Sequence, residues 1–226
     1  MTKQKLFYLF FAFTLLWTGC QISDKKGTQK KAESQSSEVP TPAWRHDAII
    51  YEVNIRQYTR EGTLNAFAEH LPRLKELGVD ILWLMPVHPI GEENRKGKLG
   101  SYYSIKDYKG INPEFGTMED FKNLVEKVHA HDMHLILDWV ANHTAWDHPW
   151  TEEHPEWYLQ NDSGEIIAPH EDWTDVAGLD YDKPEVHDAM ADAMTFWVEE
   201  ANIDGFRCDV AGMVPVEFWE KARKEI

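Results

Sequence analysis

From Trp44 onward the chain alternates short apolar and β-branched runs with segments of helical periodicity, and this alternation restricts the possible folds most. Strands that each lead into an amphipathic helix are typical of parallel βαβ units, in which helices cover a sheet. The predicted strands are residues 49–55, 79–85, 135–139 and 203–208. The sequence therefore predicts an α/β fold with a parallel sheet.

Each predicted helix has a recognisable signal at one of its ends. Proline suits the first turn of a helix but interrupts its interior, and glycine is common just after the last turn. The signals are Pro72 splitting the helical pattern of residues 64–74, Gly78 ending it, the Thr117–Asp120 capping box, and Pro184 and Pro215 opening the last two helices. Four βα units are therefore expected in order.

Four units are half of a closed (β/α)8 TIM barrel, which needs eight units and about 250 residues. We therefore interpret residues 44–226 as the N-terminal half of such a barrel. A long insertion, residues 143–183, follows the third predicted strand and is rich in Trp, His and Asp. Long loops of this kind usually shape a site or a lid.

Residues 1–20 have the pattern of an export signal. Their apolar run, residues 6–17, is roughly half the length that a membrane-spanning helix needs. Gly19 directly before Cys20 resembles a bacterial lipoprotein cleavage box, which makes Cys20 a candidate for lipidation; ordinary secretion and a retained anchor are the alternatives. Residues 21–43 are poor in apolar side chains and are expected to be a disordered tether. An exported, membrane-anchored lipoprotein is predicted, in the periplasm or on the cell surface.

The charge balance restricts the partners. With 23 Lys and Arg against 39 Asp and Glu, the net charge is −16, which disfavours binding to nucleic acid or anionic lipid and leaves the lipid anchor as the membrane contact. The aromatic share of 12% could provide flat surfaces for a neutral polyhydroxylated ligand, although most such rings serve the core. Two cysteines cannot build a disulfide framework, and their spacing fits no zinc site.

Polar side chains gather at the ends of two predicted strands. Asp138 ends the third strand, and Asn142 and His143 follow it; Arg207 and Asp209 end the fourth. The carboxyl ends of parallel strands meet at one rim, where α/β folds build active sites. Arg207 and Asp209 are two residues apart and share one face, so the guanidinium favours the ionised carboxylate, as a nucleophile requires. A structural ion pair is the alternative.

Four segments, in order, resemble conserved stretches of the α-amylase family of glycoside hydrolases, family 13. They are Gly78-Val-Asp-Ile-Leu-Trp-Leu-Met-Pro86, Tyr102-Tyr-Ser-Ile-Lys-Asp-Tyr108 continuing to Phe115-Gly-Thr117, Asp138-Trp-Val-Ala-Asn-His143 and Gly205-Phe-Arg-Cys-Asp209. The resemblance covers residues 44–226. It implies a TIM barrel and a retaining hydrolase or transglycosylase of carbohydrate catabolism that acts on starch-like or maltooligosaccharide substrates.

The resemblance also implies roles for individual residues. Asp209 matches the nucleophile that forms a covalent glycosyl-enzyme, and Arg207 matches the arginine that orients it and keeps it ionised. His143 and Tyr103 match residues that contact the sugar at the cleavage subsite. Asp138 matches a supporting carboxylate near the arginine.

Retaining hydrolysis needs a second carboxyl group as acid/base. In the resembling family this Glu ends the fifth strand, and a further Asp ends the seventh, both of which would lie beyond Ile226. Glu217, Glu220 and Glu225 fall in the last predicted helix and are interpreted as solvated charges. We therefore expect a chain that is truncated before the acid/base Glu, inactive by itself and poorly folded, because a half-barrel leaves sheet edges unpaired.

The sequence departs from the family at two places. Many members hold calcium between the Asn of the Asn-His pair and an Asp of the insertion, but Gly178 stands where that Asp is expected. No metal or cofactor is therefore predicted, and Asn142 receives a supporting role. Gly212 and Met213 replace a frequent Lys-His pair, which leaves specificity on the leaving-group side open.

The remaining histidines and Cys208 receive structural interpretations. The spacing of His129, His131 and His134 fits no metal geometry, and Cys208 should face the helices as a buried, inert thiol. The His and Trp residues of the insertion could either stack on sugar or pack on one another; they are His148, His154, His170, Trp146, Trp150, Trp157 and Trp173.

Two other functions compete with the hydrolase. A noncatalytic surface glycan-binding lipoprotein on a degenerate barrel would not need the pair of Arg207 and Asp209. A metal-dependent barrel hydrolase using Asp138 and His143 lacks a convincing set of ligands.

Overall fold

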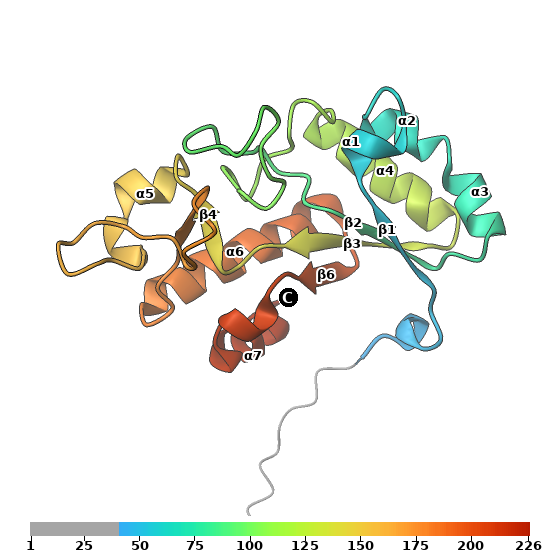
Figure 1. Cartoon of the computed structure of the whole chain (residues 1–226). Coiled ribbons are helices and arrows are strands. Elements are labelled where there is room, and N and C mark those ends of the chain that lie inside the picture. The colour runs from blue at the N-terminus through green and yellow to red at the C-terminus, as the bar shows by residue number, and fades with distance from the viewer. Residues whose placement is uncertain (1–40) are drawn as a thin grey trace, which may run out of the picture. The chain divides into compact units, whose positions relative to one another are not determined.

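The structure is a computed structural model that describes residues 41–226 (Figure 1). The predicted export signal, the lipidation site at Cys20 and residues 21–40 of the predicted tether lie outside the described residues. Within residues 41–226, no helix combines the length and apolar character that crossing a membrane requires.

A four-stranded parallel sheet forms the centre of the described chain, in the order β1-β2-β3-β6. Its strands are β1 (Ile50–Val53), β2 (Ile81–Leu84), β3 (His134–Trp139) and β6 (Gly205–Cys208). The predicted α/β fold with a parallel sheet is confirmed. All four predicted strands are present, although β1, β2 and β6 are shorter than predicted.

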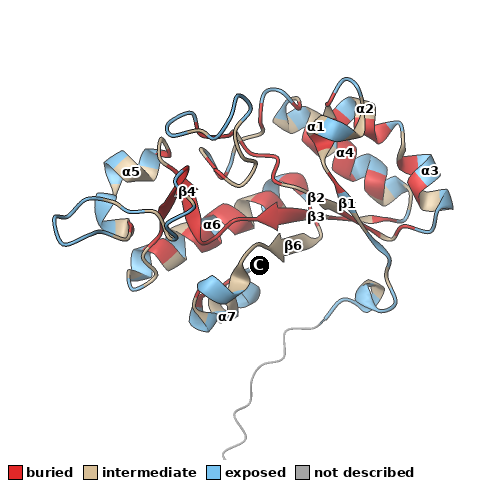
Figure 2. Ribbon diagram, in the orientation of Figure 1, coloured by how far each residue is buried: buried red, intermediate tan, exposed pale blue. Residues whose placement is uncertain are grey.

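The two faces of the sheet differ in chemistry. Leu82, Leu137 and Trp139 point to one face, where they are fully buried in the apolar core. Figure 2 shows that buried residues gather along the central strands and on the helices beside them. Their neighbours along the strands point to the opposite face, because side chains alternate in a strand. This second face carries polar groups, including Asp138 and Arg207, which are direct partners across β3 and β6.

The helices begin where the sequence signals predict them. Their bounds are α2 (Leu64–Ala68), α3 (Leu71–Glu76), α4 (Met118–Ala130), α6 (Pro184–Ala201) and α7 (Val216–Glu225). The capping box before α4 is confirmed, since Thr117 and Asp120 exchange hydrogen bonds through side chain and backbone. The break in the helical pattern is not at Pro72, as predicted, but at residues 69–70. Pro72 itself lies in the first turn of α3, where a missing backbone N–H costs little.

The first strand and the helix that follows it differ from the prediction. The first strand ends at Val53 rather than at residue 55, and Ile55 begins helix α1 (Ile55–Tyr58). The backbone carbonyl of Asn54 accepts hydrogen bonds from the N–H groups of Gln57 and Tyr58, which closes this single turn. An apolar run is compatible with either a strand or a buried helix, so periodicity alone could not separate them.

The insertion after β3 has its own small antiparallel sheet, which the sequence analysis did not predict. Its strands are β4 (His143–Ala145) and β5 (Val176–Gly178), and it also contains α5 (Pro149–Glu153) and the 3-10 helix η2 (Pro155–Trp157). Further 3-10 turns are η1 (Ala43–Arg45) and η3 (Ala211–Met213). The insertion lies beside the loop that joins β2 to α4 (Figure 1), and the N–H of Ala145 donates to the carbonyl of Ile105 at 2.8 Å.

Gly91 lies where this loop packs tightly against the insertion. A Cβ atom at Gly91 would collide with Cβ of Ala145 and come within 2.8 Å of Oδ1 of Asp147. We expect Gly91→Ala to lower the free energy of unfolding by about 1–3 kcal/mol, because the two segments must separate to admit a methyl group. Urea denaturation measures the loss. Gly212→Ala is the control, since its new Cβ would meet no atom within 4 Å; equal stability of the two variants would contradict the prediction.

Candidate active site

Asp138 is the most enclosed polar group on the open face of the sheet. Its residue is 0% exposed, and Nη1 of Arg207 donates to both of its carboxylate oxygens, at 2.9 and 3.1 Å. Trp83 Nε1 and the hydroxyl of Tyr103 donate to Oδ2, at 3.1 and 3.3 Å. Burial raises the pKa of Asp138, and the Arg207 guanidinium opposes that shift. Asp138 therefore fixes three donors that come from separate segments.

Arg207 joins Asp138 to Asp209. The same Nη1 donates to Oδ1 of Asp209 at 2.7 Å, and the guanidinium carbon lies 4.6 Å from the centre of the Trp83 ring. Within residues 41–226 the carboxylate of Asp209 has no other hydrogen-bond donor, so Oδ2 remains available to a ligand. The predicted proximity of Arg207 and Asp209 is thus present, with Asp138 as the third member.

The backbone beside Asp209 is unusual. The N–H of Asp209 donates to the carbonyl of Trp139 at 2.9 Å, which continues the sheet ladder to this residue. Val210 then has φ 39° and ψ 38°, in the left-handed region. A β-branched residue there costs on the order of 1–3 kcal/mol. The chain therefore turns sharply just after the carboxylate that Arg207 orients.

Tyr103 and His143 come from the two loops that follow β2 and β3. Burial raises the pKa of Tyr103 to about 12, with Asp138 adding to the shift, so its hydroxyl stays protonated. Burial lowers the pKa of His143 to about 4, so its ring is neutral at pH 7. Nδ1 of His143 accepts a hydrogen bond from Nδ2 of Asn142 at 3.1 Å, which leaves the ring proton on Nε2. Both side chains therefore offer neutral hydrogen-bonding groups.

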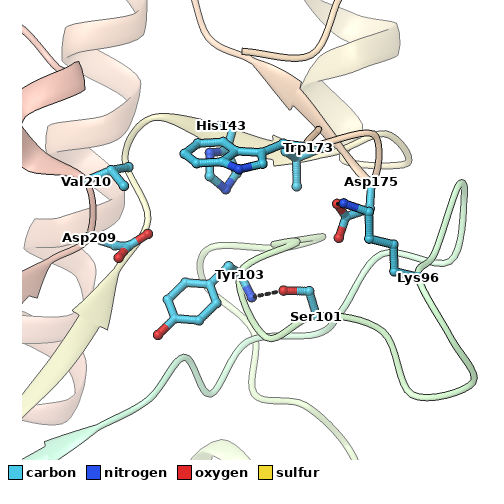
Figure 3. Close-up of a pocket in the computed structure, with 9 residues that line it drawn as sticks. Lys96, Ser101, Tyr103, His143, Trp173, Asp175, Asp209 and Val210 are labelled. Carbon is cyan, nitrogen blue, oxygen red and sulfur yellow. Dashed lines mark hydrogen bonds and ion pairs between the residues drawn. The ribbon is translucent and has the colours of Figure 1, made fainter. Parts of the chain in front are cut away.

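A cavity of about 290 Å³ brings these groups together. The cavity is lined by Asp209, Tyr103 and His143. Arg207 and Asp138 are not part of the lining: Arg207 donates a hydrogen bond to Asp209 and is itself held by Asp138. Figure 3 shows the cavity between Asp209 at one end and the insertion at the other. The cavity has five further lining residues that were not predicted from the sequence: Lys96, Ser101, Asp175, Val176 and Val210. Of these five residues, only Lys96 and Ser101 had a signal in the sequence, because they lie just before the Tyr102–Tyr108 segment.

The residues present do not fit the calcium site of many resembling enzymes. Gly178, which has no side chain to bind a cation, pairs with His143 in the β4–β5 sheet, where an Asp would be needed. Across the described part of the chain, no three His, Cys, Asp or Glu side chains are arranged to hold a metal ion.

The other histidines and tryptophans mostly pack on one another. His154 stacks on Trp157 at a centroid distance of 3.9 Å, and Trp150 contacts both His148 and Trp157. His129 and His134 both hold Asp204, at 2.8 and 3.1 Å. Trp173 also packs against histidines, with its ring 5.6 Å from the rings of both His143 and His170, and it lines the cavity as well.

Cys208 and the glutamates of α7 lie outside the cavity. Cys208 points to the helix-covered face, as predicted, but it is partly rather than fully buried, and burial raises the pKa of its thiol to about 11. A thiol with this pKa is a poor nucleophile at pH 7. Glu217, Glu220 and Glu225 are exposed on α7.

Asp138→Asn tests the supporting role of the buried carboxylate. The amide keeps the shape but cannot accept from Arg207, Trp83 and Tyr103 together. We expect the free energy of unfolding to fall by about 1–3 kcal/mol, as measured by urea denaturation. Asp162→Asn, at an exposed position of the insertion, is the control. Unfolding midpoints that coincide for the two variants would show that the carboxylate adds nothing.

Comparison with known proteins identifies the family. The model of the α-amylase catalytic domain matches residues 23–173 and 153–225. This chain belongs to the α-amylase family. It is 37% identical over 181 residues to an α-1,4-glucan:maltose-1-phosphate maltosyltransferase of Cereibacter sphaeroides (71% of this chain, 27% of the relative). It is 34% identical over 196 residues to α-amylase 3 of Dictyoglomus thermophilum (74% of this chain, 37% of the relative).

A solved α-amylase from Lactobacillus plantarum has the same fold. The two structures superpose with a TM-score of 0.76 at 47% sequence identity, over 79% of this chain and 42% of that one. The chain therefore spans about a third of the length of the curated α-amylase-family relatives named above, and less than half of this solved structure.

Proposed function

We propose that this chain is the N-terminal half of the (β/α)8 barrel of a retaining, α-glucan-active glycoside hydrolase. The observation that carries the proposal is the arrangement of Asp138, Arg207 and Asp209, in which one guanidinium nitrogen holds two carboxylates at the ends of adjacent strands. A carboxylate fixed from one side, with its other oxygen toward a cavity, suits attack on an anomeric carbon.

In this proposal each cavity residue has one task. Oδ2 of Asp209 attacks the anomeric carbon, the glycosidic bond breaks, and a covalent glycosyl-enzyme forms. Arg207 orients Asp209 through the hydrogen bond to its Oδ1, and the ring of Tyr103 packs against the sugar. His143 donates a hydrogen bond to a sugar hydroxyl from Nε2. Asp138 holds Arg207, and Asn142 fixes the tautomer of His143.

The leaving oxygen needs a proton from a second carboxyl group. We propose that a Glu after a fifth strand supplies it, from a segment outside these 226 residues. The relatives named above support this assignment, because they extend well beyond the matched region.

Substrate and location are part of the same proposal. The related enzymes are named for starch-type glucans and maltose derivatives, and the neutral hydroxyl and imidazole in the cavity suit sugar hydroxyls. We propose starch-like chains or maltooligosaccharides as substrates. Export and anchoring through Cys20 are proposed from the sequence of residues 1–20, and metabolic labelling with palmitate tests the anchor.

Covalent trapping tests the catalytic proposal. An activated 2-fluoro glucosyl donor is incubated with the full-length protein, and peptides are mapped by mass spectrometry. We expect the label on Asp209. A label on another side chain refutes the assignment. Glycan binding with no label in a protein that also lacks hydrolytic activity supports the alternative, a noncatalytic glycan-binding lipoprotein.

A further inference from the structure

Hydrogen bonds hold the guanidinium of Arg207 at a single nitrogen atom. Nη1 donates to Asp138 at 2.9 and 3.1 Å and to Asp209 at 2.7 Å. Within residues 41–226, Nε and Nη2 have no hydrogen-bond acceptor, and the side chain is 35% exposed. A contact through two nitrogens fixes the plane of a guanidinium, as in bidentate pairs with carboxylates. Here the plane depends on both carboxylates accepting from Nη1 at the same time.

Trp83 gives Arg207 a further contact, from a third strand. In the register of β2 and β3, Trp83 pairs with Ile136. Asp138 lies two residues farther along β3 and pairs with Arg207 of β6, so these two side chains share the open face of the sheet with Trp83. The guanidinium carbon lies 4.6 Å from the centre of the indole ring, which is a cation–π contact. The indole is itself tied to Asp138, since Nε1 donates to Oδ2 at 3.1 Å.

The contact with Trp83 matters most when Asp209 carries a sugar. In the proposed reaction Oδ2 of Asp209 bonds to the anomeric carbon, and the ester that results is neutral. Hydrogen bonds to an ionised acceptor are roughly twice as strong as those to a neutral one, so the ester holds Nη1 less firmly than the carboxylate did. Asp138 takes no part in this bond and continues to attract the guanidinium. The ring of Trp83 is also unchanged by the reaction, and its flat face opposes rotation of the guanidinium toward Asp138.

Hydrolysis of the glycosyl-enzyme needs the guanidinium in its original place. The oxygen of a water molecule bonds to the anomeric carbon, and the water gives a proton to the acid/base Glu proposed above. The bond to Oδ2 breaks, and its electron pair returns to Asp209 as the negative charge of the carboxylate. A donor already aimed at Oδ1 stabilises that charge without reorganising. A guanidinium that has turned away stabilises it only after moving back, so the second step slows.

We propose that Trp83 is a positioning residue, which holds the guanidinium of Arg207 toward Asp209 while Asp209 is covalently bound to the sugar. The inference rests on the proposed function, because it concerns the glycosyl-enzyme of that reaction. It assigns Trp83 a larger effect on the second step than on the first. In the first step the carboxylate of Asp209 still binds Nη1, so the guanidinium depends less on the indole ring.

Trapping kinetics on the full-length protein separate the two steps. Intact mass spectrometry follows the gain of the 2-fluoro glucosyl label and, after excess donor is removed, its loss. Trp83→Leu and Trp83→Met both remove the ring and leave an apolar side chain. We expect each to slow the loss of label by about 5- to 30-fold, the value of a cation–π contact, and the gain by less than about threefold. Trp83→Phe keeps an aromatic face without the N–H and should lose the label faster than either.

The outcomes separate positioning from a structural role. A Trp83 that only supported the fold would change the fraction of protein that takes up label, but not the rate constant of its loss. Trp44→Leu is the matched control, because Trp44 stacks on His134 at the amino end of β3, at a centroid distance of 4.1 Å; both rate constants should stay unchanged.

Equal slowing of gain and loss in Trp83→Leu and Trp83→Met, or no slowing of the loss, would overturn the proposal. So would a Trp83→Phe variant that loses the label as slowly as Trp83→Leu, since the aromatic face would then have no effect. The proposed function is tested separately by the unchanged protein: if that protein takes up no label, the glycosyl-enzyme itself is refuted.

Discussion

Asp209→Asn in the full-length protein is expected to lower kcat for maltooligosaccharide hydrolysis by at least about 10⁴-fold, as loss of a nucleophile does in other enzymes. The amide matches the carboxylate in shape, so the cavity and its contacts to Arg207 remain. It lacks the charge and the nucleophilic oxygen that a covalent glycosyl-enzyme requires. Substrate affinity should change far less than turnover, because the proposed binding contacts come from Tyr103 and His143.

Steady-state kinetics and calorimetry on one preparation measure both quantities. Glu217→Gln, at an exposed carboxylate of α7, is the matched control and should retain the activity of the unchanged protein. Turnover by Asp209→Asn within tenfold of that control would mean that another residue attacks the sugar.

Acidification is expected to destabilise the folded protein strongly through three buried histidines. Burial lowers the pKa of His88, His143 and His148 to about 4 in each case, against 6.5 for a solvated imidazole. Between these values the unfolded chain binds more protons than the folded chain, so stability falls as the pH falls from 6.5 toward 4. A difference of about 2.5 pH units corresponds to roughly 3 kcal/mol for each histidine. Together they would remove most of the stability of a typical domain.

Urea unfolding of the full-length protein at pH 7, 6 and 5, followed by tryptophan fluorescence, measures this loss in a range where few carboxylates titrate. His88 is the informative position, because it is fully buried beside Trp139 and Trp197 and its Nε2 has no partner among residues 41–226. His88→Gln should reduce the proton uptake on unfolding by about one, whatever its stability at pH 7. A free energy of unfolding that stays constant from pH 7 to pH 5 would contradict the burial of these neutral rings.

The sequence was sufficient to predict the sheet and the central charged group. Arg207 and Asp209 could be placed together because a strand returns to the same face every second residue, and Asp138 because neighbouring parallel strands end at one rim. The first inference depends on local periodicity, and the second on the predicted order of parallel strands in the sheet. The structure adds that Asp138 and Arg207 are register partners.

Other features depend on contacts between distant segments and could not be predicted. Lys96 and Asp175 are 79 positions apart and meet because two loops interlock at Gly91 and Ala145. Trp83 has no polar signal in the sequence, yet its indole N–H reaches Asp138. Ile55, the first residue of helix α1, ends a strand-like run in the sequence, and a helix of one turn gives no periodicity that could separate it from the strand.

The left-handed backbone at Val210 has a practical consequence for engineering. Glycine or asparagine accepts this conformation with less strain than valine, so replacing Val210 is an obvious way to raise the melting temperature. The same replacement would relax the turn just after Asp209, the proposed nucleophile. Under that proposed role, thermostability and turnover are opposed at a single residue, and a screen for heat resistance alone would select against the activity it is meant to preserve.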